Sequence, residues 1–181
     1  MRIEADGFEF YFPDAIHAFR FDEQDKVTPH FHGLSHAMKA VDLVVELPTH
    51  YLFIEIKDFH AGDDYDFKRI SDVEQRASRQ SRFNHLRKVL KHKFRDTWLY
   101  RWAEGKMDKP VHFLCLLTLD NGLLGAMNKE LRRELPIKPA GARWTRALAQ
   151  SCIVLNPERW NESFPKWPVA RTLAGSSPAV A

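Results

Sequence analysis

The sequence has few cysteines, no long apolar run and no basic leader segment. Its 181 residues include only 2 cysteines, Cys115 and Cys152, both in apolar, strand-like stretches. We therefore expect buried free thiols, not a disulfide framework. The longest apolar runs, such as residues 113–117, fall far short of the roughly 20 residues that cross a bilayer. The acidic, aromatic N-terminal segment does not have the layout of a signal peptide. These absences predict a cytoplasmic protein that does not enter a membrane.

The bulk composition is that of a folded domain. Hydrophobic residues make up 44% of the chain and charged residues 28%, whereas disordered chains are less apolar. A chain of this length supports one core. We expect a single domain over residues 1–171, followed by a flexible tail at 172–181 (TLAGSSPAVA), whose small residues offer no face to bury.

The net charge of +3 conceals two oppositely charged segments. Residues 1–66 hold 5 Lys/Arg against 14 Asp/Glu, a net of −9, whereas residues 67–106 hold 12 against 4, a net of +8. An acidic segment followed by a basic one is typical of a cation site beside a surface for a polyanion. The alternative is that the basic residues form the solvated face of a helix.

Hydrophobic periodicity predicts alternating strands and helices. In the first half we expect a strand near 8–12, a helical turn at 14–18, a loop at 22–37, and a hairpin of strands 38–47 and 51–57. In the second half we expect a helix at 72–103, a buried strand at 111–119, helices at 124–135 and 144–150, a strand at 151–155 and a helix at 157–164. The apolar stripe of the long helix runs through Leu86, Leu90, Phe94, Trp98 and Trp102. Strands covered by helices on two sides make an α/β or α+β fold.

The hairpin places three charged residues on one face. If its turn is centred on residues 48–49, residues whose numbers add to 97 face each other, so Asp42 lies opposite Glu55. Because strand side chains alternate, Lys57 shares the face of both carboxylates. The opposite face of the hairpin is wholly apolar and must pack on the core.

This arrangement suits a divalent cation. Two carboxylates directly opposite across a ladder destabilise the strand pair by roughly 0.2–1 kcal/mol. A cation bound between them makes their interaction favourable. Carboxylate oxygens and a neighbouring backbone carbonyl, here that of Ile56, are ligands that Mg²⁺ and Mn²⁺ prefer. The Lys57 ammonium would neutralise charge at a scissile phosphate or orient the attacking water. The alternative is a solvent-facing strand with ordinary charges, since a Glu-x-Lys triplet alone is weak evidence.

The hairpin motif resembles that of the PD-(D/E)XK phosphodiesterase superfamily, which includes restriction endonucleases and Holliday-junction resolvases. The matching residues are Asp42 in KAVDLVVEL and Glu55-Ile56-Lys57 in YLFIEIKD, and Val41 stands where the family has proline. The resemblance implies a restriction-endonuclease-like fold, a central mixed sheet in α-β-β-β-α-β order flanked by helices. It also implies that Asp42 and Glu55 bind Mg²⁺ and that Lys57 serves phosphodiester hydrolysis.

The family resemblance leaves two further features open. Many members carry an additional acidic residue on the first helix, for which the candidates here are Glu9, Asp14, Glu23 and Asp25. Related enzymes often act as dimers, so a homodimer remains a candidate assembly.

Basic and histidine residues supply candidate nucleic-acid contacts. Arg87, Lys91 and Arg95 recur every four residues on the long helix, away from its apolar stripe, and such a row could track phosphates. A loop just before the hairpin contains His30, His32 and His36. We interpret these histidines as substrate contacts, and a zinc site built on them is the weaker alternative, since no fourth ligand is evident.

The leading hypothesis is a Mg²⁺-dependent nuclease, with Mn²⁺ as a substitute, that hydrolyses phosphodiester bonds of DNA or another nucleic acid. The alternative from a different class is a catalytically silent nuclease-like fold that binds nucleic acid or a partner protein.

Overall fold

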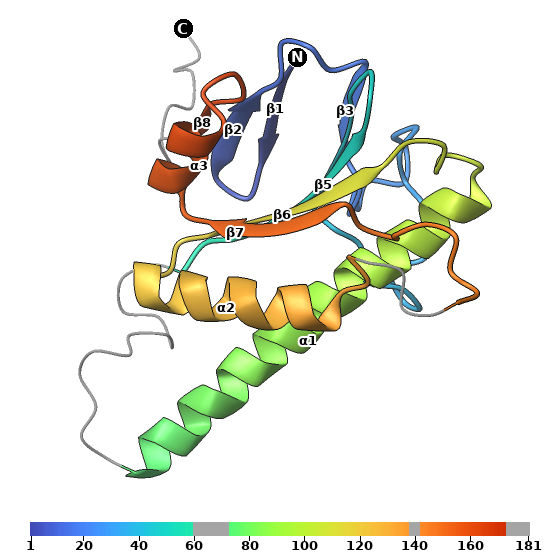
Figure 1. Ribbon diagram of the computed structural model, residues 1–181. Coiled ribbons are helices and arrows are strands. Elements are labelled where there is room, and N and C mark those ends of the chain that lie inside the picture. Colours follow the sequence, from blue (N-terminus) through green and yellow to red (C-terminus); the bar gives the residue numbers. More distant parts are fainter. Residues whose placement is uncertain (60–72, 138–141, 173–181) are drawn as a thin grey trace, which may run out of the picture.

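The computed structural model describes residues 1–59, 73–137 and 142–172, which build a mixed α+β fold around a five-stranded sheet (Figure 1). The strands, in spatial order, are β3 (His17–Arg20), β4 (Leu43–Glu46), β5 (Tyr51–Lys57), β6 (Val111–Leu117) and β7 (Ser151–Leu155). Strands β3, β4 and β5 pair antiparallel, whereas β6 and β7 continue the sheet parallel to β5. The predicted mixed sheet is therefore confirmed.

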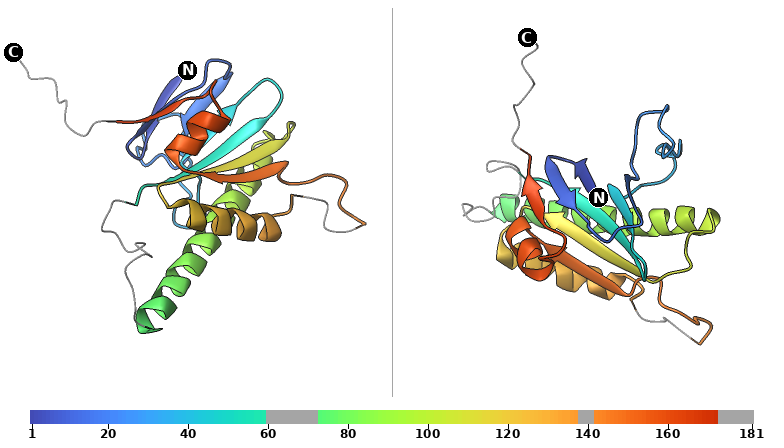
Figure 2. Two further views of the ribbon diagram at one scale, coloured as in Figure 1. Left: turned by 60° about the vertical axis from the view of Figure 1, so that its left-hand side comes forward. Right: turned by 90° about the horizontal axis from the view of Figure 1, so that it is seen from above.

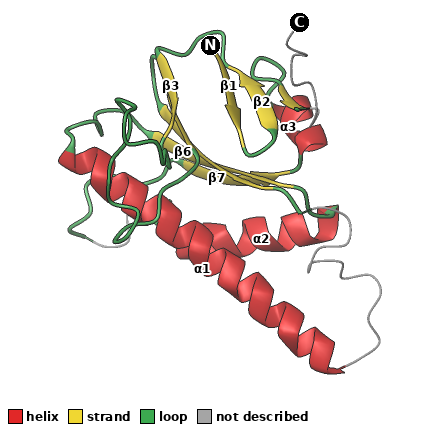
Figure 3. Cartoon of the chain, turned by 180° about the vertical axis from the view of Figure 1, so that it is seen from behind, coloured by secondary structure: helices red, strands yellow, loops and turns green. Residues whose placement is uncertain are grey.

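Two layers cover the sheet, one on each face (Figures 1 and 2). Helices α1 (Val73–Ala103) and α2 (Asn121–Glu134) cross one face, as Figure 3 shows from behind. The other face carries a three-stranded sheet and a short helix. These elements are β1 (Arg2–Ala5), β2 (Phe8–Tyr11), β8 (Val169–Arg171) and α3 (Pro157–Ser163).

Local sequence explains where the shorter helices begin. Asp120 caps α2, its carboxylate accepting hydrogen bonds from the backbone N–H groups of Gly122 and Leu123. Asn156 caps α3 in the same way, and Pro157 follows at the first helical position, where its missing N–H costs nothing. Both caps fix the point at which the chain leaves the buried strands β6 and β7.

Both faces of the hairpin β4–β5 are buried. Leu43 and Ile54 pack in a core with the small sheet and α3, as expected for the apolar face. Val44 and Phe53 lie on the face of the acidic pair, and they pack in a second core with α1 and α2. The prediction of one packed face was therefore incomplete, because the long helix lies directly over the face that carries Asp42 and Glu55.

Three local predictions were wrong. Residues 14–18 contain no helical turn, because 17–20 form β3, which gains a ladder with β4 that a single turn cannot match. Residues 144–150 form no helix and are irregular chain with several bends. The strand expected at 38–47 begins only at Leu43, since Lys39 N–H and Val41 N–H donate to side chains of α1 instead of a neighbouring strand.

Other predictions are confirmed with changed limits. Leu86, Leu90 and Phe94 are buried beneath α1, whereas Trp102, at the end of the expected stripe, is 56% exposed. Cys115 and Cys152 are buried free thiols. In the expected tail, Thr172 donates its N–H to the Gly7 carbonyl oxygen, and 173–181 lie outside the described residues. Among the described helices, none combines the length and apolarity needed to span a bilayer.

Candidate functional site

The observed hairpin register is the one that the sequence predicted. Leu43 pairs with Ile54 and Glu46 with Tyr51, so the same register extended by one pair sets Asp42, just before β4, opposite Glu55, just after Ile54 on β5. Asp42 Oδ2 accepts a hydrogen bond from the Ile56 backbone N–H at 2.5 Å. This bond fixes the Asp42 carboxylate against β5, beside Glu55.

Both carboxylates are withdrawn from solvent. Asp42 is 1% exposed and Glu55 is 0% exposed. Glu55 Oε2 accepts no hydrogen bond from the described residues. A buried carboxylate without donors is costly unless a positive charge lies close to it.

Lys93 of α1 supplies that positive charge. Its Nζ lies 3.1 Å from Asp42 Oδ1 and 2.7 Å from Glu55 Oε1, so one ammonium joins the two acids. In the sequence, Lys93 is one of the 12 Lys/Arg residues of the basic segment 67–106. Nothing in the local pattern distinguishes it from its neighbours, because its role depends on how α1 is rotated against the sheet.

Charge and burial shift the pKa values of this group. Burial, reinforced by the charge of Asp42, raises the pKa of Glu55 to about 8, although Lys93 and Lys57 act against this. Burial alone would lower the pKa of Lys93, but the carboxylates of Glu55 and Asp42 more than offset it and hold the pKa above its usual range. Lys93 is therefore protonated at neutral pH, between the two acids.

Lys57 connects the buried pair to the surface. Its Nζ lies 3.2 Å from Glu55 Oε1, and its side chain is 34% exposed. The three residues predicted from the sequence, Asp42, Glu55 and Lys57, are thus brought together. Ile56 takes part through its N–H, while the role expected of its carbonyl oxygen stays a prediction.

Asp22 is an acidic residue near the site that the sequence analysis missed. It follows β3, where the Phe21 N–H donates to the Asp42 carbonyl oxygen at 2.9 Å. Burial, followed by the charge of Asp42, raises the pKa of Asp22 to about 6. Two of the acids proposed for a first helix have other partners: Glu9 forms an ion pair with Arg2, and Asp14 accepts a hydrogen bond from Trp167. Recognition of β3 as a strand would have revealed Asp22.

The basic row on α1 is divided between two environments. Arg87 forms ion pairs with Glu130 and Glu134 of α2, each at 3.1 Å, and Lys91 pairs with Glu134 at 2.7 Å. Arg95 remains 65% exposed and pairs with its neighbour Asp96. Two of the three residues predicted to contact phosphate therefore form ion pairs between α1 and α2.

The loop histidines lie against aromatic rings. His30 stacks on Phe19 at 4.3 Å between ring centroids, and His32 stacks on Phe21 at 5.4 Å. His36 is exposed. In the described parts of the chain, no group of three or more metal-capable side chains converges, so the zinc alternative gains no support there.

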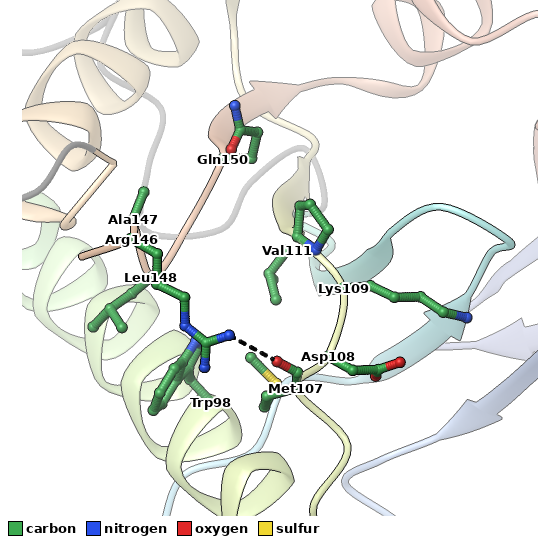
Figure 4. Close-up of a pocket in the computed structure, with 10 residues that line it drawn as sticks. Trp98, Met107, Asp108, Lys109, Val111, Arg146, Ala147, Leu148 and Gln150 are labelled. Carbon is green, nitrogen blue, oxygen red and sulfur yellow. Dashed lines mark hydrogen bonds between the residues drawn. The ribbon is translucent and has the colours of Figure 1, made fainter.

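Two cavities lie along the C-terminal half of α1, away from the acidic pair. One, of about 210 Å³, is lined by Trp98 and by the chain that leads into β6. Figure 4 shows Arg146 reaching across it to donate to the Met107 carbonyl oxygen at 3.3 Å. The other, of about 360 Å³, is mainly apolar and has Lys91 and Arg95 at its border. Neither cavity is lined by Asp42, Glu55 or Lys57.

Comparison of the chain with protein-family models, with curated proteins and with solved structures gave no significant match.

Proposed function

We propose that the protein is a Mg²⁺-dependent nuclease that hydrolyses phosphodiester bonds of DNA. One observation carries the proposal: Asp42 and Glu55 converge on a single point, which the Lys93 ammonium marks as a position for a cation. Glu55 Oε2 is buried and accepts no hydrogen bond from the described residues, so its lone pairs are free to bind a cation. The donor set consists of carboxylate oxygens, and this chemistry fits Mg²⁺ or Mn²⁺.

The residues around this point would have different roles in the reaction. Asp42 and Glu55 would hold the ion, with the Ile56 carbonyl oxygen as a further ligand. A bound Mg²⁺ ion would supply neutralisation of phosphate charge and activation of a water molecule. Lys57, partly exposed beside Glu55, would contact the scissile phosphate or orient the attacking water. Because Lys93 lies between the acids, it must withdraw when a metal ion enters.

The order of the central elements is consistent with a restriction-endonuclease-like arrangement. Three antiparallel strands, β3 to β5, are followed by α1, the parallel strand β6, α2 and β7. The proposal departs from the expected family pattern at the start, because the hairpin β1–β2 precedes β3 where a first helix was expected. In place of an acid on a first helix, the accessory acid would be Asp22, two residues after β3 and within electrostatic range of Asp42.

Cleavage assays test the proposal directly. Plasmid, linear and branched DNA are incubated with the purified protein and Mg²⁺ or Mn²⁺, and chelator is the control. We expect cleavage that depends on the divalent ion. Absence of cleavage on all substrates with both ions would contradict the proposal.

We expect the affinity for Mg²⁺ to increase with pH until about 8. Glu55 must lose its proton to bind the ion, and its pKa is about 8 in the metal-free protein. Below that pH the apparent affinity should fall by about tenfold per pH unit, since binding then displaces a proton. Calorimetry in two buffers of different ionisation enthalpy measures how many protons are released when Mg²⁺ binds. An affinity that does not change between pH 6 and pH 9 would show that Glu55 is not a ligand.

We expect the basic row to contribute salt-dependent DNA affinity. Each lost phosphate contact reduces the slope of log affinity against log salt by about 0.9. Arg95→Ala should show most of this reduction because Arg95 is 65% exposed and pairs with a single carboxylate, whereas Arg87→Ala should show less because two glutamates already hold its charge. The control is Arg159→Ala, on α3 across the sheet. If the Arg95 and Arg159 variants show equal slopes of log affinity against log salt, the basic row does not contact DNA. His30, His32 and His36 stay predicted substrate contacts.

One observation favours the second candidate, a nuclease-like fold that binds nucleic acid or protein without cutting it. Lys93 already neutralises the acidic pair, and both acids are almost completely covered. In that case the lysine replaces the metal ion permanently. Calorimetric titration with Mg²⁺ and Mn²⁺ separates the candidates, since the silent fold would bind neither ion while retaining DNA affinity.

A further inference from the structure

Two histidines meet at the end of the sheet remote from the acidic pair. His50 precedes β5, five residues before Glu55, which corresponds to about 16 Å along an extended strand. His112 lies on β6, where it pairs in register with Leu52. The two imidazole centroids are 4.7 Å apart, and their planes are inclined by 73°.

A hydroxyl group contacts the Nδ1 atom of each ring. His50 Nδ1 is 2.9 Å from Thr49 Oγ1, and His112 Nδ1 is 2.8 Å from Ser151 Oγ. A neutral imidazole that donates from Nδ1 to a hydroxyl oxygen carries its lone pair on Nε2. Hydrogen bonds of this kind orient metal-binding histidines in proteins and fix their tautomer. In the tautomer in which Nδ1 carries the proton, each ring therefore has an Nε2 available for a ligand.

The surroundings favour neutral rings beside a negative charge. Burial lowers the pKa of His50, and burial followed by the charge of His50 lowers that of His112. The carboxylate of Asp14 acts to raise the pKa of His50, so the negative charge of Asp14 lies within electrostatic range of this ring. Trp167 fixes this carboxylate, since its Nε1 donates to Asp14 Oδ1 at 2.8 Å.

We propose that His50 and His112 form a binding site for a transition-metal ion of the Zn²⁺ class. Two imidazoles bound to one tetrahedral ion, with Zn–N distances of about 2.0–2.1 Å, place their centroids about 5 Å apart, close to the observed 4.7 Å. No third metal-capable side chain joins the pair in the described part of the chain, so water completes the coordination.

This site does not depend on the proposed nuclease function. Imidazole nitrogen selects Zn²⁺, Cu²⁺ or Ni²⁺, whereas the carboxylate pair of Asp42 and Glu55 suits Mg²⁺. A bound ion would join the turn between β4 and β5 to the start of β6. The two sites therefore differ in position, in ligand type and in the metal that each prefers.

Zn²⁺ binding to the full-length chain and its variants tests the site. We expect one Zn²⁺ ion per chain, and an affinity at least about 100-fold lower in both His50→Gln and His112→Gln, because each loses a direct ligand. Glu55→Gln should keep the affinity, which separates this result from any failure of the nuclease proposal. His85→Gln is the matched control, since His85 is exposed on α1.

Two further measurements exclude an indirect effect of the substitutions. Ser151→Ala removes only the hydroxyl group and should lower the affinity by about 10–100-fold. Cu²⁺ bound to the wild-type protein should show electron-paramagnetic-resonance coupling to two imidazole nitrogens. Unchanged Zn²⁺ affinity in the two histidine variants, or a loss of binding in Glu55→Gln instead, would overturn the proposal.

Discussion

Replacement of Glu55 with glutamine should abolish Mg²⁺-dependent cleavage without unfolding the protein. Glutamine keeps the volume of the side chain in its buried position but removes the charged ligand. Loss of an outer-shell partner of a metal already costs about 10–100-fold, so loss of a direct ligand should reduce the cleavage rate by at least about 100-fold. Cleavage rate at saturating Mg²⁺ measures the effect.

Stability distinguishes the loss of a ligand from the loss of the fold. The folded-state pKa of Glu55 is about 8, above the usual 4.5, so the metal-free protein loses stability as pH rises from about 4.5 through 8. Glu55→Gln has no such titration and should be at least as stable as the wild type at pH 9. Thermal unfolding at pH 6 and pH 9 measures this, with Glu158→Gln, exposed on α3, as the control. An active Glu55→Gln protein would refute the nuclease site.

Replacement of Lys93 with methionine should make the stability of the protein dependent on divalent cations. The substitution leaves Asp42 and Glu55 together in the core without their ammonium partner. Removal of one partner of a buried ion pair costs about 3–5 kcal/mol. For a chain of this size, that corresponds to a fall in Tm of about 6–20 °C. Added Mg²⁺ should recover much of the loss, because the ion takes the position that Lys93 has left.

The matched control for this variant is Lys88→Met, on the exposed surface of the same helix, which should change the free energy of unfolding by less than about 0.5 kcal/mol. Combination with Glu55→Gln should make Lys93→Met less harmful, since one buried charge is then absent. The two substitutions are therefore coupled. If Mg²⁺ does not raise the Tm of Lys93→Met, the acids hold no metal ion, and the catalytically silent fold becomes the better interpretation.

The hairpin shows how much of the site could be predicted from sequence. A two-residue turn fixes the pairing register and the alternation of side chains fixes the face, and together they place Asp42 opposite Glu55. The observed register agrees with that prediction. Strands β5 and β7 were likewise predicted with their observed limits, since their apolar runs are bounded by turn residues.

Short segments with weak periodicity were predicted poorly. Residues 17–20 form a strand only because the edge of β4 offers a ladder, and 144–150 lack the length to nucleate a helix alone. The start of β4 was misplaced for a related reason. Asp96 and Thr97, far away in the sequence, accept the N–H groups of Lys39 and Val41.

The sequence by itself determined the acidic hairpin, the helix that follows it and the buried strands, because each depends on periodicity over neighbouring residues. Only the tertiary structure decided what lies against the acids. The rotation of α1 selects Lys93 from a row of similar basic residues, and the pairing of β3 brings Asp22 toward Asp42. The meeting of His50 with His112 likewise needs the parallel pairing of β5 with β6. Such contacts join residues that are distant in the chain, and no local pattern records them.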